Sequence, residues 1–88
     1  MIKKEKMNLS IIAPKGSLFN GEVNSVTLPG ALGPFQVLAN HAPVLSSLIP
    51  GRITYRVGDK SSSFSVKGGI SSVANNQIVV VCSPIEKQ

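Results

Sequence analysis

Turn-forming residues punctuate this chain so closely that little room is left for a helix. Gly, Pro and Asn signals recur every 6 to 12 residues along the 88 residues, and such residues end regular structure. Windows of helix length show no convincing apolar spacing of 3.6 residues. Short segments between frequent turns are typical of a β-sandwich or a flattened barrel. We therefore expect an all-β chain.

The segments between the turns have the apolar alternation of strands. In the cleanest case, Ile53, Tyr55 and Val57 alternate with Arg and Thr, which predicts a half-buried strand. Residues 77–82 are apolar on both faces, so we expect a central strand covered on both sides. Residues 44–49 fit a short strand or a turn of helix. Further strands are expected at 8–13, 17–23, 25–28, 35–38, 61–67 and 70–73.

Two asparagine-containing pairs differ in what they predict. Asn75-Asn76 predicts a tight hairpin, because Asn tolerates positive φ. Asn20-Gly21 fits either a hairpin turn or a bulge within one strand, and the residues alone leave both open.

Composition determines which residue types must fill the core. Apolar residues form 42% of the chain, aromatic residues 5%, and Trp is absent, so Val, Ile and Leu must fill the interior. We expect a flexible tail at 1–7, one domain at 8–83 and a short tail at 84–88.

The lysine-rich start lacks the apolar region of a signal peptide. Nothing approaches the roughly 20 apolar residues of a membrane span, so membrane association would require a partner.

The formal charge of +5 favours an ordinary solvated surface. Three of the lysines lie in the first six residues, and Arg52, Arg56, Lys60 and Lys67 are spread apart. The alternative is a small basic β-sandwich that binds single-stranded nucleic acid, which requires aromatic residues for base stacking. Few aromatic residues accompany these cations, which disfavours nucleic acid as a partner.

Residues with catalytic or metal-binding chemistry are few and scattered. Cys82 is the single cysteine and lies in an apolar run, where a buried inert thiol is expected. One His and four dispersed acids make neither a metal cluster nor an acid-base pair. His41 lacks the partners of a catalytic triad, so a contact role is favoured. We therefore expect no catalytic residue, no metal and no cofactor.

Four separated stretches together resemble the N-terminal domain of ATP synthase epsilon subunits. The similarity extends from about Leu9 to Cys82, and the second and third stretches are the most specific. The four stretches are Leu18-Phe19-Asn20-Gly21-Glu22-Val23, Val26-Thr27-Leu28-Pro29-Gly30, Asn40-His41-Ala42-Pro43-Val44-Leu45 and Val66-Lys67-Gly68-Gly69-Ile70.

This resemblance implies a sandwich of about ten strands at the foot of the central stalk of a proton-translocating F-type ATP synthase. Such a subunit is a non-catalytic rotor part that links gamma to the c-ring, in a complex with alpha and beta. It lies peripherally at the cytoplasmic face of the bacterial inner membrane. The resemblance also implies a bulge at Gly21 and a gamma contact at His41 and Ser46. The c-ring contact it implies comprises Gly30, Ala31, Leu32, Gly33, Pro34, Phe35 and His41.

The sequence departs from this family at three places. Pro34-Phe35 stands where the family often has a glutamate, which puts a carboxylate contact to the ring in doubt. Ala39-Asn40 replaces Pro-Gly before the His, and Asn can adopt the positive φ of that Gly. Many epsilon subunits continue into a helical hairpin that inhibits hydrolysis. Here we expect no C-terminal helices and no helical inhibitory function.

Overall fold

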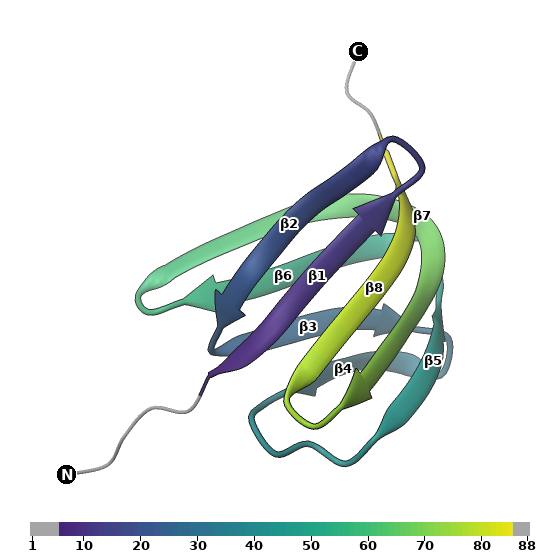
Figure 1. Ribbon diagram of the computed structural model, residues 1–88. Coiled ribbons are helices and arrows are strands. Elements are labelled where there is room, and N and C mark those ends of the chain that lie inside the picture. Colours follow the sequence, from purple (N-terminus) through teal and green to yellow (C-terminus); the bar gives the residue numbers. More distant parts are fainter. Residues whose placement is uncertain (1–5, 86–88) are drawn as a thin grey trace, which may run out of the picture.

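The computed structural model describes residues 6–85, and this part of the chain contains eight strands and no helix (Figure 1). The all-β expectation is confirmed. Within the described residues no helix could cross a membrane. The strands are β1 (Met7–Ala13), β2 (Gly16–Val23), β3 (Ser25–Gly30), β4 (Gly33–Val37), β5 (Val44–Leu48), β6 (Gly51–Val57), β7 (Lys60–Ala74) and β8 (Gln77–Pro84).

The strands form two layers that enclose one core. The β1–β8 layer has the order β2-β1-β8-β7-β5, with β1 and β8 parallel and the other neighbours antiparallel. The β3–β6 layer lies behind it in Figure 1 and contains β4, β3, β6 and the first half of β7. β5 also touches β3 through the pair Gly30–Leu48. The two layers therefore make a continuous but flattened sandwich.

β7 is long enough to belong to both layers. Its first half pairs with β6 and its second half with β8, and the register to β8 shifts between Val66 and Gly69. Gly68 and Gly69 adopt φ of 144° and 159° at this bend. The sequence predicted two separate strands on either side of this glycine pair. The structure has one bent strand, which is one reason for eight strands rather than about ten.

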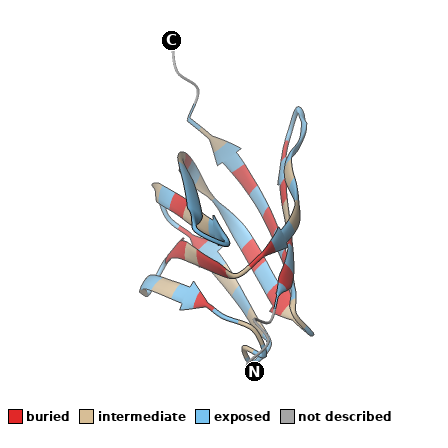
Figure 2. Ribbon diagram, turned by 90° about the vertical axis from the view of Figure 1, so that its left-hand side faces the viewer, coloured by how far each residue is buried: buried red, intermediate tan, exposed pale blue. Residues whose placement is uncertain are grey.

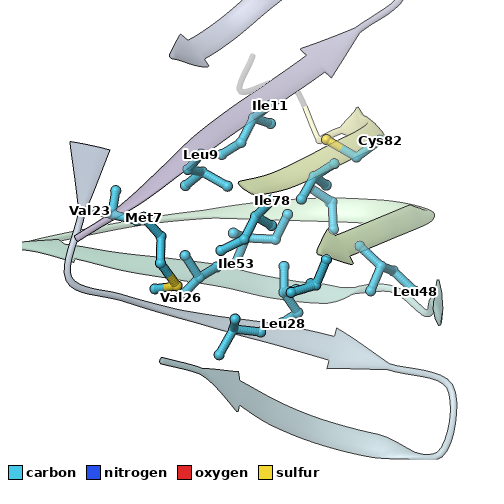
Figure 3. Close-up of a cluster of buried hydrophobic side chains, with 14 residues drawn as sticks. Met7, Leu9, Ile11, Val23, Val26, Leu28, Leu48, Ile53, Ile78 and Cys82 are labelled. Carbon is cyan, nitrogen blue, oxygen red and sulfur yellow. The ribbon is translucent and has the colours of Figure 1, made fainter. Parts of the chain in front are cut away.

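The core consists mainly of branched aliphatic side chains from both layers (Figure 3). Alternate residues of β1 and β8 point into it, as the period of a strand requires. Phe19 on β2 and Tyr55 on β6 pack ring to ring, with centroids 4.4 Å apart. The buried cluster is Met7, Leu9, Ile11, Val23, Val26, Leu28, Val37, Leu48, Ile53, Val66, Val73, Ile78, Val80 and Cys82.

The Asn20-Gly21 pair is neither a hairpin nor a bulge. β2 runs through it, and Gly21 pairs in register with Leu9. The register shift instead leaves Leu18 as the extra residue of β2, because Ile11 pairs with Phe19 while Ile12 pairs with Ser17. A Cβ at Gly21 would lie 3.2 Å from the Phe19 ring. Glycine therefore serves ring packing here, and the bulge implied at Gly21 is wrong.

Two local ambiguities are settled by the backbone. The segment predicted at 44–49 is a strand rather than a helical turn, since β5 extends from Val44 to Leu48 and pairs with β7 over that length. Asn75 and Asn76 form the predicted hairpin with φ of 52° and 59°. β1 begins at Met7, which is buried, so the ordered domain starts one residue before its expected boundary. β8 extends to Pro84, the first residue of the expected C-terminal tail, and most of the two predicted tails lies outside the described residues.

Candidate functional site

Reactive groups do not gather anywhere in the described part of the chain. Among residues 6–85, no three His, Cys, Asp or Glu side chains are close enough to hold a metal ion. Cys82 is buried, as predicted, and desolvation by burial raises the pKa of its thiol. A raised pKa disfavours the nucleophilic thiolate. The candidate site is therefore a surface rather than a cluster of reactive groups.

β8 has apolar residues on both its core-facing side and its solvent-facing side. Ile78, Val80 and Cys82 are buried, whereas Val79 and Val81 are 41% and 47% exposed. β8 is central, as predicted, because β1 and β7 flank it. The prediction that both of its faces are covered is wrong for the described chain. Its second apolar face is open.

Cross-strand register gathers further aliphatic residues around Val79 and Val81. Ile12, Val81 and Ile70 are aligned neighbours on β1, β8 and β7. The next row runs Ser10, Val79, Ser72 and Leu45, the last at 71% exposure. Exposed and buried positions alternate along these strands in Figure 2. We call Ile12, Leu45, Ile70, Val79 and Val81 the apolar patch.

The outer face of the β3–β6 layer has the opposite chemistry. One row across four strands consists of Gln36, Thr27, Thr54 and Ser63. Arg52 and Arg56 lie on the same side of β6 as Thr54 and are exposed. Tyr55 and Phe64 instead pack against the core. This face therefore lacks the aromatic stacking that single-stranded nucleic acid would use.

The β3–β4 connection is a narrow projecting turn. Gly30 pairs with Gly33, which leaves Ala31 and Leu32 at the tip, and the Leu32 side chain is fully exposed. A Cβ at Gly30 would lie 2.8 Å from both the Phe35 ring and the Gly33 carbonyl oxygen. Close packing of backbone against Phe35 therefore shapes this turn. An uncharged turn of this kind can dock by shape, apolar contact and backbone hydrogen bonds.

The loop between β4 and β5 carries His41. Asn40 has φ of 68°, as expected for the residue that replaces Gly. The His41 backbone N–H donates to the Leu38 carbonyl over 3.1 Å. Nδ1 of His41 lies 2.7 Å from the Ala42 carbonyl oxygen, which can only accept, so Nδ1 carries the proton. This contact fixes the orientation of the ring.

A hollow of about 560 Å³ brings the predicted contact residues together. Gly30 to Phe35, His41 and Ser46 all line it, beside Leu45. Ser46 is half-buried and pairs with the buried Ser71, and its hydroxyl donates to the Ser47 carbonyl over 3.1 Å. Leu45 lies on the exposed side of β5. The hollow is therefore continuous with the apolar patch through Leu45.

Sequence reasoning missed the apolar patch as a functional surface. The available signal was the apolar character of both faces of residues 77–82, which predicted cover from within the chain. The register of β1, β7 and β5 against β8 could not be read from the sequence. Only that register assembles Ile12, Ile70 and Leu45 beside Val79 and Val81.

Comparison with known proteins gives a consistent family. The family model described as "ATP synthase, Delta/Epsilon chain, beta-sandwich domain" matches residues 6–88. The chain is 40% identical to the "ATP synthase epsilon chain" of Caulobacter vibrioides over 76 residues, covering 86% of this chain and 88% of the relative. It is also 40% identical to that of Leptospira borgpetersenii serovar Hardjo-bovis over 76 residues, covering 86% of this chain but 60% of the relative.

Solved structures share the fold at low sequence identity. A chain of the Euglena gracilis mitochondrial ATP synthase, solved with OSCP, F1 and the c-ring, superposes with a TM-score of 0.84 at 20% identity. That match covers 100% of this chain and 58% of the other. A chain of the Tetrahymena thermophila mitochondrial ATP synthase central stalk and c-ring gives 0.74 at 20% identity, covering 93% and 66%. The chain thus spans about three fifths to two thirds of these structural relatives.

Proposed function

This chain belongs to the β-sandwich family of ATP synthase delta and epsilon chains, and from that premise we propose that it is the epsilon subunit of a proton-translocating F-type ATP synthase. In this role it is a non-catalytic part of the central stalk. It turns with the rotor, links gamma to the c-ring and so couples proton flow to ATP synthesis.

The apolar patch is the observation that carries this proposal. The two rows that contain it consist of aliphatic and serine side chains without charge, a depletion of charge that characterises the cores of stable interfaces. Exposed apolar surface on a soluble domain marks an interaction site. We assign the patch to gamma, because a permanent rotor contact requires a large apolar interface.

The β3–β4 turn is the proposed seat on the c-ring. Leu32 at its tip is fully exposed, and the Ala31 N–H is bonded to the Ser47 carbonyl of β5, so contact with the ring loops would involve Leu32 and the remaining backbone groups. The hollow between this turn and β5 lies beside His41 and Leu45. This continuity supports a subunit that touches both partners at one end of the sandwich.

The proposed role also implies a location in the cell. A subunit of this complex is associated with the membrane through its partners. We propose that it lies peripherally at the cytoplasmic face of the bacterial inner membrane, where the loops of the c-ring and the central stalk meet.

Site-specific crosslinking in the assembled complex tests this assignment. A photoreactive maleimide is placed at Leu32→Cys or Leu45→Cys in a Cys82→Ala background, and Ser63→Cys on the polar face is the matched control. We expect adducts of the first with subunit c and of the second with gamma, and neither adduct from the control. Purification of the tagged protein without any ATP synthase subunit would overturn the proposal.

A further inference from the structure

Two asparagines from distant parts of the chain hold each other at the His41 loop. The Asn40 backbone N–H donates to Oδ1 of Asn76 over 2.6 Å, and Nδ2 of Asn76 donates to Oδ1 of Asn40 over 3.3 Å. The residues are 36 positions apart, one in the β4–β5 loop and the other in the β7–β8 turn. Both adopt positive φ, at 68° and 59°. The two side-chain contacts thus join two tight backbone bends.

Asn76 is itself anchored to the sheet. Its carbonyl oxygen accepts the Asn8 N–H over 2.9 Å, which fixes the β7–β8 turn against β1. Glycine could adopt the same positive φ at both positions. Asn and Asp are the residues that can adopt that φ at modest cost and also reach across to the loop with a hydrogen-bonding side chain. Asn76 therefore supplies a contact that a merely permissive turn residue would lack.

The loop held in this way presents a small hollow of about 260 Å³. Asn40, His41, Ala42 and Pro43 line one side of it, and Asn76 lines the other. The His41 ring is held in one orientation by its own contact to the Ala42 carbonyl. A loop fixed before binding loses less conformational entropy on docking than a mobile one.

We infer that Asn76 is a positioning residue for docking, because its side chain holds the His41 loop in the conformation that a partner subunit binds. We call the mutual contact of Asn40 and Asn76 the asparagine brace. This inference rests on the proposed function, in which gamma is the partner beside His41. Without the brace, the loop samples other conformations, and apparent affinity falls with the fraction of competent molecules.

The test compares three single variants of the full chain. Asn76→Gly keeps the turn and removes the brace, whereas Asn76→Asp retains an acceptor for the Asn40 N–H. Asn24→Ala is the matched control. In the unsubstituted chain, Oδ1 of Asn24 accepts the Gly58 N–H over 2.7 Å. This bond also joins residues far apart in sequence, 34 positions, and the two segments do not line the hollow. Amide hydrogen exchange at Asn40 and affinity for the purified gamma subunit are measured for each.

We expect Asn76→Gly to bind gamma about tenfold more weakly, with faster exchange at the Asn40 amide. Asn76→Asp should restore affinity to within about twofold of the unsubstituted chain. Its carboxylate accepts the Asn40 backbone N–H and, once the Asn40 side-chain amide has turned to point Nδ2 toward it, that N–H as well. Asn24→Ala should lose comparable stability and keep its affinity. This pattern would separate positioning from a general loss of stability.

Two results would contradict the account at different levels. Unchanged affinity of Asn76→Gly, alongside faster exchange at Asn40, would overturn the positioning role while leaving the proposed function intact. Failure of the unsubstituted chain to bind gamma would overturn the proposed function and with it the docking role of the brace. A loss in Asn24→Ala equal to that in Asn76→Gly would also overturn the inference, because stability alone would then explain both.

Discussion

The two outer faces of the sandwich have opposite chemistry although they enclose the same core. Outside the β1–β8 layer, Val79, Val81 and Ile70 lie exposed side by side. Outside the β3–β6 layer, the central row is Gln36, Thr27, Thr54 and Ser63, with arginines beside it. The polar pattern outside the β3–β6 layer is that of an antiparallel sheet with one face in solvent. The apolar pattern outside the β1–β8 layer is that of a sheet buried on both faces.

This difference separates what the fold requires from what an assembly requires. A two-layer sandwich needs one apolar face per layer, and the buried cluster already provides both. The apolar patch adds nothing to that interior. The fold alone therefore does not require a second apolar face on one layer, and we propose that gamma covers it.

The bend of β7 joins the two layers, and breaking it should have the largest effect. A Cβ at Gly69 would collide with the Val81 carbonyl oxygen and lie 2.8 Å from Cα of Cys82. We expect Gly69→Ala to lower the free energy of unfolding by about 4 kcal/mol or more, measured by urea denaturation.

A second glycine provides the control for backbone strain at this bend. Gly16 also has positive φ, at 131°, but a Cβ there meets nothing within 4 Å. Gly16→Ala should cost only about 1–3 kcal/mol, from backbone strain. Equal losses in the two variants would show that strain rather than collision governs the bend.

Two neighbouring residues of β8 allow a direct comparison of its buried face with its exposed face. Ile78→Ala should cost about 2–5 kcal/mol, because it removes buried atoms and leaves a cavity. Val79→Ala on the exposed side should change the stability of the isolated chain by no more than about 0.5 kcal/mol. Thermal unfolding of both variants checks this. A large loss in Val79→Ala would mean that the apolar patch is covered within the free protein.

Ser71 is a polar exception on the inner side of the β1–β8 layer. It is fully buried, and its hydroxyl has no hydrogen-bond partner among residues 6–85. Ser71→Ala should therefore raise the free energy of unfolding by about 1 kcal/mol, seen as a melting temperature roughly 4–8 °C higher for a chain of this size. Ser72→Ala, on the exposed side, should have little effect. Destabilisation by Ser71→Ala would reveal a bond to that hydroxyl.

Local patterns in the sequence predicted most of the strands but not their partners. Strand alternation and turn residues located the β6 strand and the Asn75-Asn76 hairpin, because both depend on local conformational preference. The bulge implied at Gly21 was wrong, because Gly21 pairs in register with Leu9 and the Phe19 ring packs over it. The bend at Gly69 continues one strand between layers. Tertiary packing decided these cases.

The candidate site was predictable only where the sequence has short motifs. The residues of the β3–β4 turn and His41 came from the resemblance to epsilon subunits, and the structure gathers them around one hollow. The apolar patch depends on register across four strands. The asparagine brace depends on a contact between residues 36 positions apart. Neither arrangement has a local signature.

In the proposed assembly the apolar patch docks the gamma subunit, and the polar outer face of the β3–β6 layer does not. The direct test measures gamma affinity for Val81→Lys and for Ser63→Lys, which place the same charge on opposite faces. We expect Val81→Lys to weaken binding at least about 100-fold, because it buries an unpaired charge in an apolar interface, and Ser63→Lys to change it less than about threefold. Both variants should melt as the unsubstituted chain does. Equal losses, or a larger loss in Ser63→Lys, would contradict the account.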